Sequence, residues 1–414
     1  MNIFFSGIGG VGIGALAQLA QDAGYTVSGS DTQHSLMTDE LEKRGIPVYF
    51  KQDAKYIKKL HSQSPIDWFV HTAALPSNHP ELLMAQKLGI TCSKRDELLS
   101  QIIQEKNLKL IAISGTHGKT TTTGMLVWAL QQLDMPVSYA IGTTLSFGPS
   151  AQYQPGSEYF VYECDEFDKN FLRFTPHLSL ITTIGYDHVD TYPTRDDYFT
   201  AFSDFLRQSN HSIGWRRDYA WLPNLPEEKL WQLQDTEVQD TGLAGEHNRR
   251  NSTLVLKALE FLGLPHSSQT IESFPGTNRR FEKLADNLYS DYGHHPTEIA
   301  ATLQLAKEIS ETVVLVYQPH QNTRQYEVKP QYRTAFENAN RIYWLPTYLS
   351  REDKTLPVLR PSELIADITN RSSVEVIDLN DDLWEAIEQH RLVGHLVLCM
   401  GAGSIDSWVR SHLK

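Results

Sequence analysis

The chain has little cysteine and no excess of positive charge. Only three cysteines, Cys92, Cys164 and Cys399, occur in 414 residues, and none stands in a Cys-x-x-Cys spacing. They are too few and too scattered for a disulfide framework, so we expect a reducing compartment. The formal net charge of −13 argues against a general nucleic-acid or anionic-membrane surface.

Long hydrophobic runs are also absent. No apolar run approaches the ~20 residues that a membrane-spanning helix needs, and Asn2 to Phe5 reads as a strand rather than as a basic leader with a cleavage site. With 40% hydrophobic and 21% charged residues, the composition is that of a globular protein. We therefore expect a cytoplasmic monomer or weak homodimer with no membrane and no nucleic-acid partner.

Short apolar, strand-like runs alternate with helix-period segments along the chain. This alternation is typical of parallel α/β domains, and it restarts twice. A new strand, Lys109 to Ser114, follows the polar pair Lys106-Asn107, and a third unit starts near Phe274, beyond a helix from Asn248 to Leu262. The sequence thus predicts three α/β domains at 1–107, 108–268 and 269–414, within the two to four that the length allows.

A glycine-rich turn follows the first strand. Gly7 to Gly12 (GIGGVG) fits the pattern Gly-x-Gly-x-x-Gly, and Asp31 lies 19 residues further on, at the end of a second strand. Such a turn presents backbone N–H groups to a diphosphate at a helix N-terminus, and the acid would hydrogen-bond a sugar or a base. Close helix–strand packing would also explain the glycines. The candidate substrate-binding residues here are Gly9, Gly10, Val11, Gly12 and Asp31.

A second phosphate-binding loop follows the strand Lys109 to Ser114. The segment from Gly115 to Thr123 reads GTHGKTTTT, and Gly-Lys-Thr between a strand and a helix is the chemistry of a Walker A loop. Lys119 would neutralise the β- and γ-phosphates of ATP, and the Thr120 hydroxyl would bind Mg²⁺. A separate ATP loop makes a nicotinamide dehydrogenase a poor interpretation of the first motif. The predicted ATP contacts are Gly115, Thr116, His117, Gly118, Lys119, Thr120 and Thr121.

Further motifs in the same order resemble the muramyl ligases, the ATP-dependent enzymes that build the peptide of peptidoglycan on a UDP-sugar. They are ECDEFD (163–168), DHVDTY (187–192), GEHNRRN (245–251), NRRFE (278–282), SDYGHHPTE (290–298) and QPH (318–320). The resemblance implies a Rossmann-like UDP-binding domain, a central P-loop ATPase domain with a mostly parallel sheet, and a Rossmann-like C-terminal domain. It is strongest to the branch that ligates L-alanine to the lactyl carboxylate of UDP-N-acetylmuramate through an acyl phosphate, with ATP and two Mg²⁺ ions.

The resemblance also implies roles for single residues. Glu163 would hold Mg²⁺ together with Thr120, and His188 would meet a second metal ion near the substrate carboxylate. A surface acid and an ordinary loop histidine are the structural alternatives for these two positions. The residues expected around the ATP nucleotide are His247, Asn248, Asn251, Arg280 and Asp291, although Asn248 could simply cap a helix.

The C-terminal motifs would line the reaction centre and the amino-acid site. The residues implied there are Tyr292, His294, His320 and Arg324, although His294-His295-Pro296 could be a plain turn. An arginine after a strand end suits a substrate carboxylate or phosphate. Lys119, His188, Arg280 and His294 are therefore the candidate catalytic residues.

Some positions depart from the family pattern, and three of them bear on the choice of acceptor. Gln321 and Asn322 replace an arginine and a tyrosine in the usual phrase QPHRYTR, and Phe167 stands where the alanine-adding branch commonly has serine. A tyrosine at that position is typical of the branch that attaches the ready-made tripeptide L-Ala-γ-D-Glu-meso-diaminopimelate to the same UDP-sugar. That recycling activity is one alternative, and a non-catalytic nucleotide-binding regulator of the same fold is another.

Overall fold

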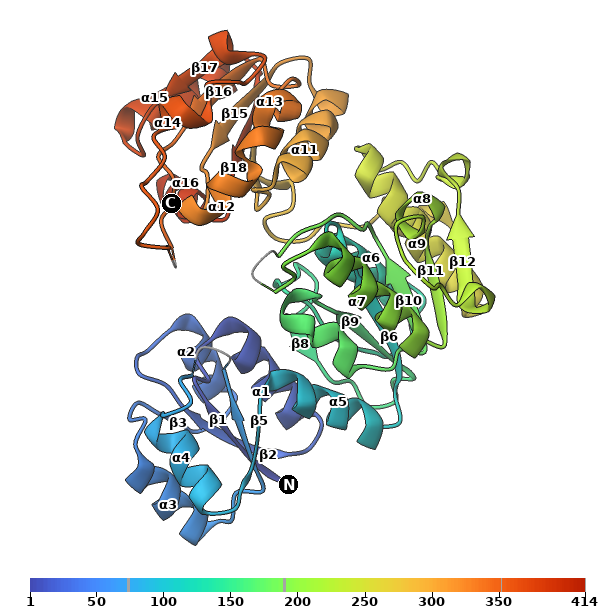
Figure 1. Cartoon of the computed structure of the whole chain (residues 1–414), viewed down its shortest axis with the longest axis vertical. Helices are drawn as coiled ribbons and strands as arrows, with labels where there is room; N and C mark the ends of the chain where they lie inside the picture. The colour runs from blue at the N-terminus through green and yellow to red at the C-terminus, as the bar shows by residue number, and fades with distance from the viewer. Residues whose placement is uncertain (73–74, 189–190, 351, 414) are drawn as a thin grey trace. The chain divides into compact units, whose positions relative to one another are not determined.

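The computed structural model in Figure 1 describes residues 1–72, 75–188, 191–350 and 352–413. These residues form two compact units, one of Met1–Glu237 with Leu254–Phe274 and one of Val238–Thr253 with Pro275–Lys414. Two sheets lie in the first unit and one in the second, and their strands are mostly parallel. The predicted fold of three α/β domains is therefore confirmed, and we propose the domain ranges 1–107, 108–268 and 269–414 for it.

The first sheet is parallel throughout, with the strand order β3-β2-β1-β4-β5. Its strands are β1 (Asn2–Ser6), β2 (Thr26–Ser30), β3 (Val48–Tyr49), β4 (Trp68–His71) and β5 (Thr91–Ser93), and its helices are α1 (Val11–Asp22), α2 (Leu36–Lys43), α3 (Ala54–Gln63), α4 (Pro80–Lys87) and α5 (Arg95–Glu105). Phe4 packs on one face of the sheet, whereas Ile3 and Phe5 pack on the other, as alternation along a strand requires. The strand order reverses beside β1, which is where open α/β sheets bind ligands.

The second sheet has the order β12-β11-β10-β6-β9-β7-β8, and only β7 and β8 pair antiparallel. Its strands are β6 (Lys109–Ser114), β7 (Val137–Ala140), β8 (Ala151–Gln152), β9 (Tyr159–Glu163), β10 (Leu178–Ile181), β11 (His211–Trp215) and β12 (Leu230–Leu233). The helices that accompany it are α6 (Lys119–Gln132), α7 (Arg195–Gln208), α8 (Arg216–Tyr219), α9 (Glu246–Phe261) and α10 (Ser268–Glu272).

One hydrophobic cluster joins the first two domains. Leu98 and Leu99 of α5 belong to the same buried cluster as Phe160 and Tyr162 of β9. Burial of apolar surface is the main favourable contribution to packing. The first and central domains are therefore one compact unit, and the positions of their side chains can be compared directly.

The third sheet has the order β13-β14-β18-β15-β16-β17, with β13 and β14 antiparallel and the remaining pairs parallel. Its strands are β13 (Glu282–Ala285), β14 (Leu288–Asp291), β15 (Val313–Tyr317), β16 (Arg341–Trp344), β17 (Val374–Val376) and β18 (Leu396–Met400). The helices are α11 (Pro296–Ile309), α12 (Asn322–Val328), α13 (Tyr332–Ala335), α14 (Pro361–Leu364), α15 (Asp381–Leu392) and α16 (Ile405–His412). Every residue of β15 is buried, which is why this strand is an unbroken apolar run. Within the described residues, no helix has both the length and the apolar character to cross a membrane.

Candidate functional site

The phosphate loop connects β6 to α6 in the central domain. Gly118 precedes the helix with φ +88°, and Gly115 has φ +133°. A side chain at Gly115 would lie 2.4 Å from the Thr182 hydroxyl and 2.7 Å from the Thr183 carbonyl, so only glycine fits. The loop is tied to the end of β10, because the His117 N–H donates to Thr183 Oγ1 at 3.0 Å. These contacts fix the position of the N-terminus of α6, whose backbone N–H groups are of the kind that bind anions.

Lys119, the first residue of α6, is fixed by an ion pair. Its Nζ donates to the Gly115 carbonyl at 2.6 Å and to Glu166 Oε2 at 2.7 Å. Burial alone would lower the pKa of Lys119, but the carboxylates of Glu166 and Asp165 raise it above its usual value. Burial likewise acts to raise the pKa of Glu166, but Lys119 and His188 overcome it and lower that pKa to about 2. Both partners are therefore charged at neutral pH.

Glu163 ends strand β9 beside the start of α6. Its Oε1 accepts the Thr120 hydroxyl at 2.6 Å, and its Oε2 accepts the Gly142 N–H at 2.6 Å. A Cβ at Gly142 would stand only 3.1 Å from Oε2, so the backbone closes tightly around the carboxylate. One hydroxyl and one carboxylate oxygen on neighbouring elements form the donor set that Mg²⁺ prefers. Thr120 and Glu163 thus fit the predicted metal site.

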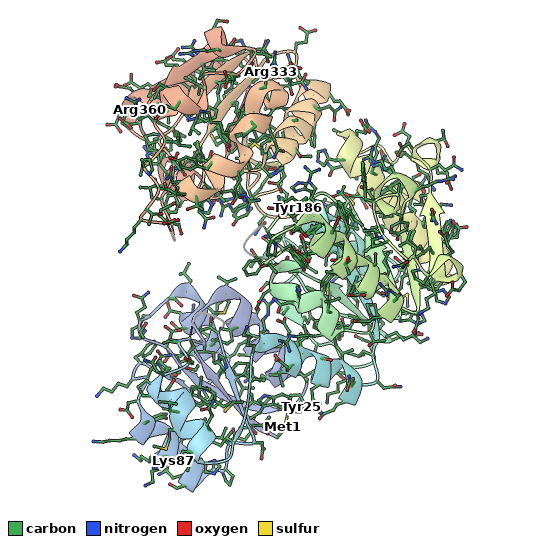
Figure 2. All side chains as sticks on the ribbon, in the orientation of Figure 1. Met1, Tyr25, Lys87, Tyr186, Arg333 and Arg360 are labelled. Carbon is green, nitrogen blue, oxygen red and sulfur yellow. The ribbon has the colours of Figure 1, made fainter. Side chains whose placement is uncertain are left out.

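His188 lies on the loop after β10, with its backbone in the left-handed region (φ +58°). Its Nε2 is 3.5 Å from Glu166 Oε1, and its ring is 5.4 Å from that of Phe167. Burial acts to lower the pKa of His188, but the Glu166 carboxylate raises it overall. Tyr186, a residue labelled in Figure 2, closes this loop, because its hydroxyl donates to the Tyr192 carbonyl at 2.8 Å. Val189 and Asp190 of the DHVDTY motif lie outside the described residues.

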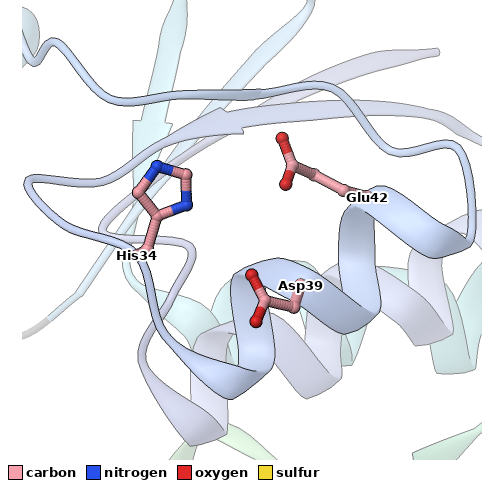
Figure 3. A group of neighbouring side chains, drawn as sticks. All are labelled: His34, Asp39 and Glu42. Carbon is pink, nitrogen blue, oxygen red and sulfur yellow. The ribbon is translucent and has the colours of Figure 1, made fainter.

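The described ranges contain two groups of histidine and carboxylate side chains that could hold a metal ion. Within each group, every residue has one ligand atom that lies within 4.8 Å of the ligand atoms of the other two. The first group is Asp165, Glu166 and His188, at the phosphate loop. The second consists of His34, which precedes α2, and Asp39 and Glu42 of α2, and Figure 3 shows the three side chains turned towards a common space. This second group is exposed, and solvated acids on a surface are common, so we assign it no ion.

The glycine-rich turn lies between β1 and α1. The N–H groups of Gly7 and Ile8 donate to the Ser30 carbonyl, and the Gly9 N–H donates to Asp31 Oδ2 at 2.7 Å. The other carboxylate oxygen of Asp31 accepts the Thr32 N–H at 2.7 Å. Asp31 therefore holds the turn itself, and its predicted contact with a sugar or base stays a prediction. The residues that begin α1, Gly10, Val11 and Gly12, are exposed.

A cavity of about 290 Å³ connects the start of α1 with the phosphate loop. Its lining includes Gly12 of α1, Lys119 of α6, and Glu163 and Asp165 at the end of β9. The structure thus brings the two loops that the sequence predicts to bind phosphates to one cavity. Within this first unit, the predicted Mg²⁺ ligand Glu163 lies on the same cavity as the predicted diphosphate loop.

The start of α9 belongs to the second unit. Burial, together with the cations Arg249 and Arg280, lowers the pKa of His247 to about 4, although Glu308 opposes the shift. The Asn248 side chain donates to the Ala244 carbonyl at 3.0 Å. This bond ties the first turn of α9 to the segment before it, and the predicted contact of Asn248 with a nucleotide remains a prediction. Asn251 is buried one turn further along the helix.

Asp291 ends strand β14 in the third sheet. Its carboxylate accepts the N–H groups of Phe281 at 2.8 Å and of Gly293 at 2.6 Å. Burial raises the pKa of Asp291 to about 6, against the lowering effect of Arg280. The Arg280 guanidinium is 3.6 Å from Glu298 Oε1 and lies 5.5 Å from the centre of the Tyr292 ring. These two predicted nucleotide contacts are therefore neighbours within the second unit.

Aromatic rings gather at the carboxyl ends of β14 and β15. The His294 ring lies 5.6 Å from that of Tyr292 and 5.7 Å from that of His320, and His320 stacks on Tyr348 at 5.7 Å. Burial lowers the pKa of His294 to about 4, with further lowering by Arg324 and His320 and opposition from Glu298. His294 is consequently neutral near pH 7. The structure brings together the four residues predicted to line the amino-acid site, because Arg324 acts electrostatically on both histidines.

The comparisons with known proteins agree with this fold. Family models match three consecutive parts of the chain: "Mur ligase family, catalytic domain" at residues 2–107, "Mur ligase middle domain" at 113–230 and "Mur ligase, glutamate ligase domain" at 279–403. A UDP-N-acetylmuramate–L-alanine ligase of Carboxydothermus hydrogenoformans is 31% identical over 98% of this chain and 95% of its own length. A ligase of the same name from Campylobacter jejuni subsp. doylei is 30% identical over 99% of both chains.

Solved structures share the architecture. The UDP-N-acetylmuramate–alanine ligase of Thermotoga maritima aligns over 100% of this chain and 98% of its own, with a TM-score of 0.75 and 23% identity. A murein peptide ligase of Psychrobacter arcticus aligns over the same shares, with a TM-score of 0.64 and 22% identity. The fold and its loops define a three-domain α/β ligase with a phosphate loop in the central domain. The chain belongs to the Mur ligase family, which confirms the resemblance of its motifs.

Proposed function

We propose that this chain uses ATP to ligate L-alanine to the lactyl carboxylate of UDP-N-acetylmuramate. The observation that carries the proposal is the cavity on which Gly12 of the glycine-rich turn, Lys119 of the phosphate loop and Glu163 all lie. The relatives at about 30% identity are named for the substrates UDP-N-acetylmuramate and L-alanine, and these names favour L-alanine over the tripeptide as the acceptor. We place the reaction in the cytoplasm.

A carboxylate needs activation before an amine can attack it. In the proposed reaction a lactyl carboxylate oxygen attacks the γ-phosphorus of ATP, ADP leaves, and an acyl phosphate forms. The neutral amine of alanine then attacks the carbonyl carbon, and the tetrahedral intermediate expels inorganic phosphate and loses a proton, leaving an amide. Transfer between two anions requires positive charge at the phosphates, and the charged ammonium of Lys119 at the start of α6 supplies it.

Thr120 and Glu163 would hold Mg²⁺, and His188 would take part in a second cation site. When bound, the metal would supply further neutralisation of the phosphate charge. Lys119 is held in place by Glu166 before it meets any phosphate, so its contact with the γ-phosphate costs little reorganisation. Residues of the second unit, Arg280 and Asp291 among them, remain the proposed nucleotide contacts of the C-terminal domain.

One observation keeps the tripeptide acceptor as a second candidate. The ring of Phe167 is 39% exposed and lies against His188, the residue proposed to stand near the substrate carboxylate. An aromatic side chain at this position is the feature that the chain shares with the recycling branch. The non-catalytic alternative is less well supported, because the chain carries the side chains that the proposed reaction needs, namely Lys119, Thr120, Glu163 and His188.

Binding and turnover together test the proposal. Calorimetric titration of the purified chain should show binding of UDP-N-acetylmuramate and none of NAD. Phosphate release from ATP should then require both the UDP-sugar and L-alanine. Tight binding of NAD without binding of the UDP-sugar would contradict the proposed function. Phosphate release at the same rate with and without L-alanine would also contradict it.

A further inference from the structure

One buried tyrosine of α7 has its hydroxyl at the phosphate loop. The side chain of Tyr198 has no exposed surface, and its hydroxyl oxygen lies 2.8 Å from Thr116 Oγ1 and 3.3 Å from Glu166 Oε1. Thr116 is part of the phosphate loop, and Glu166 is the carboxylate that pairs with Lys119. A buried hydroxyl costs free energy unless it is hydrogen-bonded. Satisfaction of these polar atoms is therefore one explanation of Tyr198, and a part in the reaction is the other.

Aromatic packing fixes the ring of Tyr198. Its centre lies 5.0 Å from that of Tyr192 and 5.1 Å from that of Phe202, and all three residues belong to the hydrophobic cluster that joins the first two domains. Side chains in a close-packed interior stay in single rotamers on the time average. The Tyr198 hydroxyl is therefore a rigid point of reference for the groups that it contacts.

The Tyr198 hydroxyl is the donor in its bond to Thr116. The Thr116 hydroxyl donates its only proton to the Gly185 carbonyl at 2.7 Å, because a carbonyl can only accept, and it accepts the Gly185 N–H at 2.8 Å. The proton between Tyr198 and Thr116 consequently comes from Tyr198. The same hydroxyl has a second acceptor, the Glu166 carboxylate, on its other side. Tyr198 thus contacts the phosphate loop and the partner of Lys119 with one polar group.

We propose that Tyr198 is a positioning residue of the ATP step, whose hydroxyl holds Thr116 of the phosphate loop in place against the Lys119–Glu166 pair. The inference rests on the proposed function, which supplies ATP as the phosphate donor. The ammonium of Lys119 already bonds the Gly115 carbonyl at one end of the loop, and Tyr198 holds the residue next to it. Groups that are held before the reaction lower its barrier, because they need no reorganisation when the reaction begins.

The full-length variant Tyr198→Phe tests this role, because it removes the hydroxyl and keeps the ring. Phosphate release is measured with saturating UDP-N-acetylmuramate and L-alanine while the ATP concentration is varied. We expect kcat/KM for ATP to fall by about 10- to 100-fold, since a displacement of ~1 Å in an active site costs up to about 10²-fold in rate. The affinity for UDP-N-acetylmuramate, measured by calorimetry, should stay within about twofold, because the contacts of the glycine-rich turn are kept.

A second buried tyrosine of the same domain provides the matched control. Tyr219 of α8 is 1% exposed, and its hydroxyl lies 2.8 Å from the Ser212 hydroxyl of β11. Tyr219→Phe therefore also removes one buried hydrogen bond, and urea denaturation checks that both variants are folded under the assay conditions. We expect Tyr219→Phe to keep the wild-type kcat and KM. Equal losses of turnover in the two variants would indicate a general loosening of the domain and overturn the positioning role.

The variant Thr116→Val removes the hydroxyl that accepts from Tyr198. It should lower kcat/KM for ATP by a comparable factor, and Tyr198→Phe should add little to this loss, because both changes break the same chain of hydrogen bonds. Losses that multiply in the double variant would overturn the inference. Wild-type turnover in Thr116→Val would also overturn it, whatever the stability of Tyr198→Phe.

The outcomes distinguish this inference from the function on which it rests. A wild-type protein that shows no acceptor-dependent release of phosphate from ATP contradicts the proposed function and this inference with it. Normal turnover of the wild type, with an unchanged kcat/KM for ATP in Tyr198→Phe, contradicts the inference alone.

Discussion

The ammonium nitrogen of Lys119 lies 2.7 Å from Oε2 of Glu166, a carboxylate with no exposed surface. Glu166 is also bound by the hydroxyl of Tyr198 at 3.3 Å and lies 3.5 Å from the ring of His188. A buried ion pair with several further partners keeps its geometry. Glu166 therefore holds the ammonium of Lys119 in position at the phosphate loop.

Loss of the ammonium should abolish most of the turnover. Lys119→Ala is expected to lower kcat by about 10²- to 10³-fold, the usual cost of one stabilising group at the transition state, while UDP-sugar affinity stays near the wild-type value. Phosphate release and calorimetry measure the two quantities. Lys109→Ala, which removes a surface lysine paired with Glu158, is the control, and wild-type turnover in Lys119→Ala would overturn the assignment of the ATP loop.

Loss of the buried carboxylate should destabilise the protein. Glu166→Gln leaves the charge of Lys119 without its closest partner, and breaking a buried pair from one side costs about 3 kcal/mol of unfolding free energy. Urea denaturation measures this cost. Glu158→Gln, in an exposed pair, should change little. Equal stability of the two variants would show that the Lys119–Glu166 pair does not hold the loop.

A second buried carboxylate should make the stability depend on pH. Glu81 of α4 accepts the hydroxyls of Ser6 at 2.6 Å and Ser30 at 2.8 Å, and burial raises its pKa from 4.5 to about 7 against the effect of these bonds. The folded state then keeps a proton that the unfolded chain releases, so stability falls as the pH rises from about 4.5 through 7.

Glu81→Gln removes that ionisation and keeps an oxygen for the two serines. We expect the unfolding free energy of the variant, relative to that of the wild type, to be higher at pH 8 than at pH 5 by about 3 kcal/mol. Thermal unfolding at the two pH values measures this difference. Glu40→Gln, an exposed position of the same domain, controls for the lost charge. A stability difference between variant and wild type that is the same at pH 5 and pH 8 would contradict the raised pKa of Glu81.

His294 should make the second unit sensitive to acid. Its pKa is lowered from 6.5 to about 4 by burial first and then by Arg324 and His320. The folded state excludes a proton that the unfolded chain accepts, so this contribution to stability is complete above about pH 6.5 and is lost as the pH falls towards 4.

The variant His294→Asn should flatten that dependence. Thermal unfolding between pH 7.5 and 5 measures it, with His266→Asn, at an exposed histidine, as the control. We expect the wild type to lose more stability than His294→Asn on acidification. Parallel curves for the two proteins would contradict the burial of a neutral imidazole at this position.

Strands and helices with strong local patterns were predictable from the sequence. The predicted strand Lys109 to Ser114 is β6, and the predicted strand Asn2 to Phe5 lies within β1. A short apolar run bounded by polar residues is the usual pattern of a buried strand in a parallel sheet. The helix predicted from Asn248 to Leu262 begins two residues earlier, at Glu246. Helix ends depend on caps, which are set by the surrounding structure rather than by periodicity.

The site was predictable only where the chemistry is local. Lys119 and Thr120 follow from the loop motif, and the contact between Thr120 and Glu163 joins two predicted residues. Glu166 was not singled out, because four acidic residues stand within six positions and only the fold selects which of them meets Lys119. The run of acids directly after a strand was the available signal.

Asp31 shows what a spacing motif does not predict. Its spacing from the glycines predicted a ligand contact, whereas in the structure its two carboxylate oxygens accept the backbone N–H groups of Gly9 in the turn and of the adjacent Thr32. A motif thus predicts which residues gather at a site, whereas hydrogen bonding decides what each of them does there.

The most direct test of the account is a comparison of acceptors in one assay. Purified protein is supplied with ATP, Mg²⁺ and UDP-N-acetylmuramate, and phosphate release is measured with L-alanine, glycine, L-serine or the tripeptide L-Ala-γ-D-Glu-meso-diaminopimelate at equal concentrations. We predict the fastest ligation with L-alanine, and slower but measurable ligation with glycine and L-serine, because one methyl or hydroxyl group discriminates by only ~10- to 200-fold. Faster ligation of the tripeptide than of L-alanine would contradict the account and establish the recycling reaction in its place.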